Sequence, residues 1–127
     1  MKATHKSELE AVRQLVKGLG GAVYVAHQGA GPRGKGGYRG LHGSAGIPDL
    51  ECFVPMDRLS ARLYAPWWEH KPDPETTMLY FRIEVKVGKD KLSDQQAEYK
   101  RLAENAGIAV IVGGLAELAS FLGVQIT

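Results

Sequence analysis

The sequence predicts an α/β fold in which helices flank a small mixed sheet, with the element order α-β-β-β-α-β-α. Apolar residues recur with the helical period over residues 4–19 and 93–106, and they alternate with other residues along 78–87. Residues 108–112 form an unbroken apolar run, which is typical of a strand covered on both faces. Because this strand follows a helix, it can lie parallel to an earlier strand. The length of 127 residues predicts a single domain, over residues 1–127.

The first helix covers residues 4–19, and a short strand follows it at residues 22–26. Two N-terminal caps fit this helix: Ser7 and Glu10 have the spacing of a capping box, and Thr4 is an alternative cap. Two consecutive glycines, at positions 20 and 21, end the helix. The apolar positions share one stripe, which consists of Leu9, Val12, Leu15, Val16 and Leu19.

A glycine-rich basic loop is predicted at residues 29–46. It holds eight of the 16 glycines and no acidic residue. Its beginning resembles a P-loop, but Gly36 stands where a P-loop needs Ser or Thr, so we expect no nucleotide cofactor. A loop of this length in a small domain is usually functional or disordered, and we expect it to be poorly ordered without a bound partner. Its basic residues are Arg33, Lys35 and Arg39.

The middle of the chain alternates strands with an irregular segment. A second strand is predicted at residues 48–54 and a third at 78–87. Between them, residues 55–77 hold four of the six prolines and both tryptophans, which predicts an irregular insertion. A short helix at residues 115–122 follows the last strand. The helix at 93–106 is predicted to bury one face, made of Tyr99, Leu102, Ala103 and Ala106.

Composition restricts the setting of the protein. The chain has one cysteine, so an intrachain disulfide is impossible, and we expect a reducing compartment such as the cytoplasm. No stretch reaches the roughly 18 apolar residues of a membrane span, so no membrane association is expected. The net charge of +2 is too small to indicate nucleic acid by itself, and the position of the charges must decide.

Three residues on two strands suggest a metal-assisted site. Glu84 and Lys86 point to one face of their strand, although an isolated pair of this kind is more often a solvated surface. Asp49 begins the preceding strand, so it can meet Glu84 at one sheet edge if the two strands are neighbours. Two adjacent carboxylates repel each other unless a cation lies between them, and oxygen ligands suit Mg²⁺ or Mn²⁺. A lysine beside them can stabilise charge that develops on a phosphate.

Two further polar residues each have a structural and a functional interpretation. Glu8 lies at the edge of the apolar stripe of the first helix. It either reaches the metal there, or it is a first-turn glutamate that the helix dipole stabilises. Gln96 faces the sheet, but Ser93 and Gln96 also have the spacing of a capping box. Lys89 and Lys91 would form a basic patch beside the acids, which suits a phosphate backbone.

Together these segments resemble the PD-(D/E)XK nuclease superfamily, and more closely its VRR-NUC branch, the virus-type replication–repair nuclease domain. The resemblance lies in an ordered set of motifs and spans most of the chain. The motifs are GSAGIPDL at residues 43–50, FRIEVKVG at 81–88 and KLSDQQ at 91–96, followed by Leu102, Gly107 and an apolar strand. A single P-D or E-x-K carries no information, but the ordered set is fairly specific.

The resemblance implies a restriction-endonuclease-like core and the cleavage of phosphodiester bonds in DNA with Mg²⁺ or Mn²⁺. It implies that Asp49, Glu84, Lys86 and Gln96 are catalytic. It also implies metal ligation by Asp49, Glu84, the main-chain carbonyl of Val85 and, less firmly because Glu10 competes, Glu8. The expected DNA-contacting residues are Arg33, Lys35, Arg39, Lys89 and Lys91.

The resemblance also implies partners and a setting. Small members of the family suggest a homodimer that cuts branched DNA or four-way junctions, in the cytoplasm of a bacterium or a phage-infected host. The insertion at residues 55–77 departs from the family pattern. It either forms a dimer interface or a DNA-contacting arm, or it packs its own tryptophans. The competing class is a non-catalytic DNA-binding protein that retains the fold.

Overall fold

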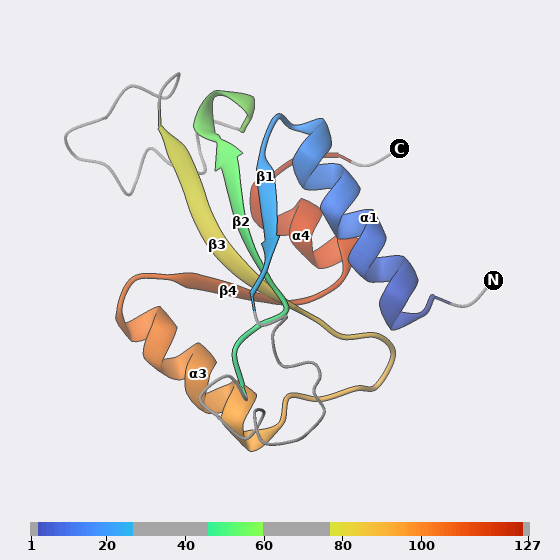
Figure 1. Ribbon diagram of the computed structural model, residues 1–127, viewed down its shortest axis with the longest axis vertical. Coiled ribbons are helices and arrows are strands. Elements are labelled where there is room, and N and C mark those ends of the chain that lie inside the picture. The colour runs from blue at the N-terminus through green and yellow to red at the C-terminus, as the bar shows by residue number, and fades with distance from the viewer. Residues whose placement is uncertain (1–2, 27–45, 60–76, 126–127) are drawn as a thin grey trace, which may run out of the picture.

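The computed structural model describes residues 3–26, 46–59 and 77–125, which form an α/β fold with helices on both faces of a four-stranded sheet (Figure 1). The order of helices and strands agrees with the prediction. The elements are α1 (His5–Gly18), β1 (Ala22–Val25), β2 (Leu50–Pro55), the 3₁₀ turn η4 (Met56–Arg58), β3 (Met78–Val85), α3 (Asp94–Asn105), β4 (Ala109–Gly113) and α4 (Leu115–Leu122).

The sheet has the order β1-β2-β3-β4 and is mixed, as predicted. β1 and β2 are antiparallel, as are β2 and β3, whereas β4 runs parallel to β3 after the crossover through α3. The two strands that lead to the predicted acids are therefore neighbours. Their register pairs Leu50 with Ile83, so the next position along each strand brings Asp49 beside Glu84.

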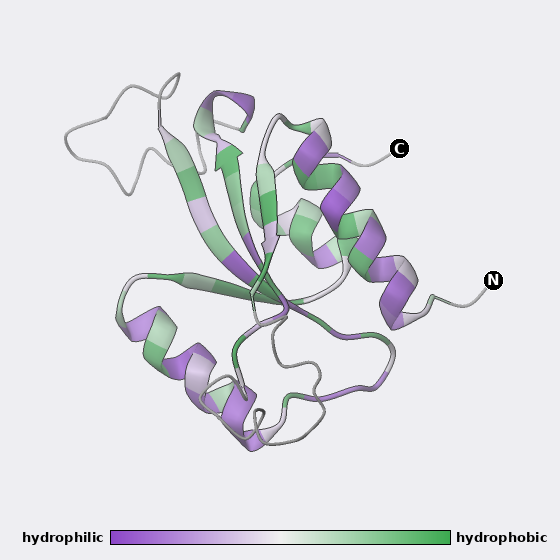
Figure 2. Cartoon of the chain, in the orientation of Figure 1, coloured by the Kyte–Doolittle hydropathy of each residue, from purple (hydrophilic) through white to green (hydrophobic). Residues whose placement is uncertain are grey.

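The hydrophobic core lies between the sheet and the pair of helices α1 and α4. Alternate residues of β2 and β3 point to this side, and cross-strand pairs such as Cys52 and Phe81 are fully buried. The ring of Phe81 packs against that of Phe121 in α4, with 5.3 Å between the centroids. Figure 2 shows the apolar stripes of both helices directed at the strands. This packing fixes the ends of β2 and β3, where the predicted site residues lie.

Helix α3 lies on the opposite side of the sheet and packs mainly against β4. Of the predicted apolar face, only Ala103 is buried, and Tyr99 is half-buried. Leu102 is 53% exposed and Ala106 is exposed, so that part of the prediction was wrong. The reason is geometric: α3 packs mainly against the edge strand β4 and reaches β3 through the side chains of Gln96 and Tyr99, so only a narrow stripe of the helix is covered. β4 itself has the predicted two-sided burial, since its adjacent residues Val110 and Ile111 are both buried.

The two longer helices begin with capping boxes. α1 is capped by Thr4, whose side chain accepts from the Ser7 amide while the Ser7 hydroxyl bonds back, so the predicted box of Ser7 and Glu10 was wrong. Ser7 lies inside the first turn, where its amide and its hydroxyl both hydrogen-bond to Thr4. In α3 the predicted box of Ser93 and Gln96 is confirmed.

Several predictions fall outside the described residues. These are the glycine-rich loop up to residue 45 with Arg33, Lys35 and Arg39, the disorder expected for it, and residues 60–76 of the insertion. They stay predictions. Within the described ranges, no helix is long and apolar enough to cross a membrane.

Candidate active site

Asp49 and Glu84 meet at the edge of the sheet where β2 begins and β3 ends. The Asp49 carboxylate reaches across to β3, because its Oδ2 accepts a hydrogen bond of 2.8 Å from the amide of Val85. Metal ligation by the main-chain carbonyl of Val85 stays a prediction. Gly46 helps to place this end of β2: its φ is +96°, and a Cβ there would meet the Gln95 carbonyl at 2.6 Å. Glycine thus allows the chain before Asp49 to pass close to the first turn of α3.

Glu84 is the centre of the site and is only 5% exposed. Its Oε2 accepts from Gln96 Nε2 at 2.9 Å and lies 3.7 Å from Lys86 Nζ. Its Oε1 is buried without a hydrogen-bond partner among the described residues. Burial, and next the negative charge of Asp49, raise the pKa of Glu84 to about 7. A buried carboxyl with one unused oxygen and a raised pKa indicates a position for a proton or a cation.

Gln96 both caps α3 and contacts Glu84, and its predicted catalytic role stays a prediction. Its Oε1 accepts from the Ser93 amide at 2.8 Å and completes the capping box of α3, while its Nε2 donates to Glu84. An amide side chain can do this because it carries an acceptor and a donor on one planar group. The start of α3 is therefore coupled directly to the carboxylate at the site.

His5 is a site residue that the sequence analysis missed. Its Nε2 lies 3.4 Å from Asp49 Oδ2, and its side chain is about half exposed. His5 precedes Glu8 by three positions, so the two side chains point along the same side of α1. The spacing from Glu8 was the one sequence signal for His5. It was not informative by itself, because Asp49 reaches the start of α1 only through the pairing of the strands.

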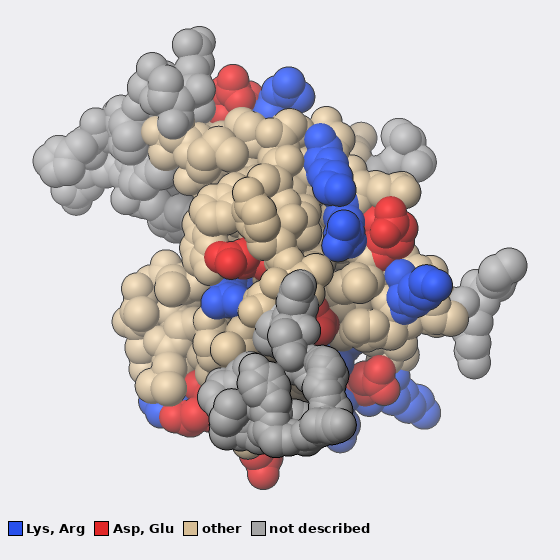
Figure 3. All heavy atoms as spheres, viewed as in Figure 1, with Lys and Arg blue, Asp and Glu red and all other residues tan. Residues whose placement is uncertain are grey.

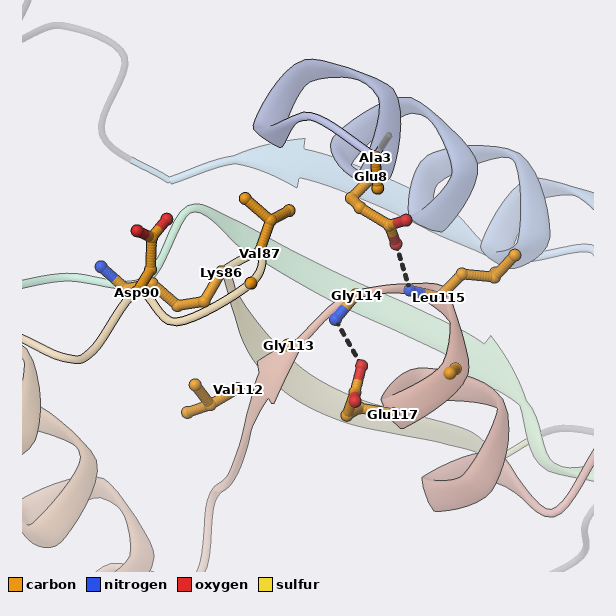
Figure 4. A pocket seen from close by; sticks show the side chains of 12 residues that line it. Ala3, Glu8, Lys86, Val87, Asp90, Val112, Gly113, Gly114, Leu115 and Glu117 are labelled. Carbon is orange, nitrogen blue, oxygen red and sulfur yellow. Dashed lines mark hydrogen bonds between the residues drawn. The ribbon is translucent and has the colours of Figure 1, made fainter. Parts of the chain in front are cut away.

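Glu8 is placed differently from the other predicted acids. Its Oε1 accepts a hydrogen bond of 2.8 Å from the Leu115 amide at the first turn of α4. Glu8 and Lys86 line one cleft of about 540 Å³. In Figure 4, the Glu8 side chain is directed at Leu115. Across the described ranges, no three His, Cys, Asp or Glu side chains form a group that could hold a metal ion. The structure thus unites Asp49 and Glu84 but gives one oxygen of Glu8 to α4.

The predicted basic patch is represented by Lys89 and Lys91, which are exposed on the loop between β3 and α3. On the face shown in Figure 3, basic and acidic side chains are interspersed. Among the described residues on this face, no large region of one sign is visible.

The structure therefore brings together Asp49, Glu84, Lys86 and Gln96. It also places His5 beside Asp49. The predicted basic residues of the glycine-rich loop lie outside the described residues. A pair of carboxylates, a cation and an amide at one sheet edge can bind a divalent cation and stabilise a negatively charged oxygen. Comparisons of the chain with protein-family models, curated proteins and solved structures find no match.

Proposed function

We propose that the protein is a Mg²⁺- or Mn²⁺-dependent DNA nuclease that hydrolyses phosphodiester bonds, of the PD-(D/E)XK type that the VRR-NUC resemblance implies. The observation that carries the proposal is Glu84, a buried carboxyl with one unpartnered oxygen, a second carboxylate beside it and a lysine 3.7 Å away. A structural ion pair would explain Lys86, but it would not explain why Asp49 is placed where it raises the pKa of Glu84.

The residues fit a hard divalent cation. Asp49 and Glu84 would hold it, since carboxylate oxygens are the ligands that Mg²⁺ and Mn²⁺ prefer and positive charge relieves the repulsion between them. The Val85 carbonyl and Glu8 are further candidates from the resemblance. A bound cation of this kind supplies positive charge beside the phosphate and a water of lowered pKa.

The side chains around the acids prepare the site for an anionic substrate. Lys86 is mostly buried and faces both Glu84 and the cleft, so its ammonium group can donate to a phosphate oxygen as negative charge develops there. Gln96 holds Glu84 in one orientation through its amide. His5 lies on the exposed side of Asp49 and can donate to a phosphate or orient the carboxylate.

We propose DNA, in particular branched DNA or four-way junctions, as the substrate and a homodimer as the active form, within a bacterial or phage-infected cytoplasm. Support comes from the family resemblance and from the basic residues of the loop at 29–46 together with Lys89 and Lys91. Two copies would permit two symmetric cuts across a junction.

A cleavage panel tests this function. The purified protein is incubated with four-way junction, flap, single-stranded and linear duplex DNA in Mg²⁺, in Mn²⁺ and in EDTA, and its mass is measured in solution. We expect cleavage with either metal, none in EDTA, and a preference for branched substrates. Failure to cut any of these DNAs with either metal would contradict the proposal.

The second candidate is a non-catalytic DNA-binding protein that retains the fold. One observation favours it: within the described residues no three possible metal ligands converge. Such a protein would bind DNA equally well in EDTA and in Mg²⁺, and it would leave every DNA of the panel intact.

A further inference from the structure

The sheet face opposite α1 and α4 carries aromatic side chains that the nuclease site does not use. Tyr24, Phe53 and Tyr80 come from the neighbouring strands β1, β2 and β3. The ring centroids of Tyr24 and Phe53 are 6.1 Å apart, and those of Phe53 and Tyr80 are 5.0 Å apart. Tyr24 is 57% exposed, and the other two are partly exposed. We call these three residues the aromatic row.

The aromatic row is continuous with the candidate active site along β3. Strand side chains alternate, so Tyr80, Arg82 and Glu84 point to the same face. The distance along the strand from Tyr80 to Glu84 is about 13 Å at the usual rise per residue. Arg82 lies between them and is held by Tyr99: its Nη1 donates to the tyrosine hydroxyl at 2.8 Å, and its guanidinium lies 5.5 Å from the ring centroid.

The described helices leave this part of the sheet uncovered. α1 and α4 pack on the opposite face, and α3 packs mainly against β4 at the far edge. Burial of the exposed Tyr24 ring against a partner is favourable, so this row beside the candidate active site favours a ligand with flat apolar surfaces.

The side chains on this face favour single-stranded over duplex DNA as the ligand. Glu51 and Arg82 are cross-strand partners on this face, and Glu84 follows Arg82 on the same face of β3, so these positions carry no surplus of basic side chains. A duplex presents its phosphates first and is attracted by a surplus of basic residues, which these positions do not supply. A single strand also carries phosphates, but its bases are unpaired and can stack on aromatic side chains, which this sheet face provides.

We propose that the aromatic row stacks the bases of an unpaired DNA strand and leads that strand to Glu84. The substrate is then DNA with a single-stranded segment, such as a flap or a splayed arm. This inference rests on the proposed nuclease function and narrows its substrate class.

The test measures binding without cleavage. Fluorescence anisotropy in EDTA compares a labelled single-stranded oligothymidine with an oligonucleotide of the same length that carries abasic sites. Both have the same phosphates, so a difference in affinity reports contacts to the bases, and the Tyr24 variants assign those contacts to the aromatic row. We expect the wild type to bind the thymidine strand about 5-fold or more tightly. Tyr24→Ala should lose most of that difference, and Tyr24→Phe, which keeps the ring, should retain it.

Leu102→Ala is the matched control, because Leu102 is similarly exposed but lies on α3. It should not change either affinity, and thermal unfolding should show that all variants fold. Equal affinity of the wild type for the two strands, or an unchanged preference in Tyr24→Ala, would overturn the proposal. So would a change in Tyr24→Ala from dimer to monomer with the preference retained, which would assign the face to a second copy of the chain.

Failure of this inference is distinguishable from failure of the nuclease function. If the wild type cuts DNA with Mg²⁺ but shows no preference for bases over abasic sites, only the stacking proposal is wrong. If it prefers bases but cuts no DNA with either metal, the nuclease function is wrong and the aromatic row is a binding surface alone.

Discussion

Glu84 has two carboxyl oxygens in unequal surroundings, and this asymmetry determines its chemistry. Oε2 is held by Gln96 and faces Lys86, whereas Oε1 is buried without a hydrogen-bond partner among the described residues. An unpaired buried oxygen is costly, and the cost is larger when the carboxyl is ionised. This oxygen lies beside Asp49, so the cost would be relieved by a proton or by the cation that the proposed function requires.

The raised pKa of Glu84 predicts how stability depends on pH. The pKa of Glu84 in the folded protein, about 7, lies above its ordinary value of 4.5. The stability that protonated Glu84 contributes is therefore complete below pH 4.5 and is lost as the pH rises through 7. Relative to Glu84→Gln, the free energy of unfolding of the metal-free wild type should fall by up to roughly 3 kcal/mol across this window. Urea unfolding in EDTA at a series of pH values measures it. Parallel curves for the two proteins would show that Glu84 titrates normally.

The start of α3 and the site share one side chain, so helix and carboxylate can be tested together. Gln96→Glu keeps an oxygen that can accept from the Ser93 amide, but it replaces the donor to Glu84 with a second negative charge. We expect the added charge to lower the stability of the metal-free protein, and cleavage to fall about 10- to 100-fold, the range for partners that orient a metal ligand. Unchanged cleavage by a folded Gln96→Glu protein would mean that Gln96 acts only as a cap.

Helices α1 and α4 are joined by a hydrogen bond between Glu8 and the Leu115 amide, and Gly114 makes room for it. A Cβ at Gly114 would clash with Glu8 Oε1, so Gly114→Ala must displace the Glu8 side chain. Each of Glu8→Ala and Gly114→Ala should cost about 1 kcal/mol, the usual effect of a lost cap.

The double variant provides the control for this pair. Since both changes remove the same hydrogen bond, their combined cost should be clearly less than the sum, which denaturant unfolding of the four proteins measures. Full additivity would show that Gly114 is needed for a reason unrelated to Glu8.

For the whole molecule, local patterns predicted the elements but few of the contacts between them. The apolar run of β4 and the capping box at Ser93 are local signals, and both were confirmed. The bond from Glu8 to Leu115 joins residues 107 positions apart, and no local pattern encodes it. His5 was missed for the same reason, because its partner Asp49 reaches α1 only through the sheet. The predicted meeting of Asp49 with Glu84 succeeded because it depended on one assumption, that their strands pair.

Metal-dependent cleavage by the wild type and Glu84→Gln, measured side by side on one branched DNA, tests the nuclease assignment most directly. Glutamine has the shape of glutamate and keeps an oxygen that can accept from Gln96, but it carries no charge. The variant should therefore fold, and it should bind the DNA in EDTA as the wild type does. We expect the wild type to cut with Mg²⁺ or Mn²⁺ and Glu84→Gln to be inactive with both. Cleavage by Glu84→Gln at the wild-type rate would contradict the site, and a wild type that binds this DNA without cutting it would contradict the function.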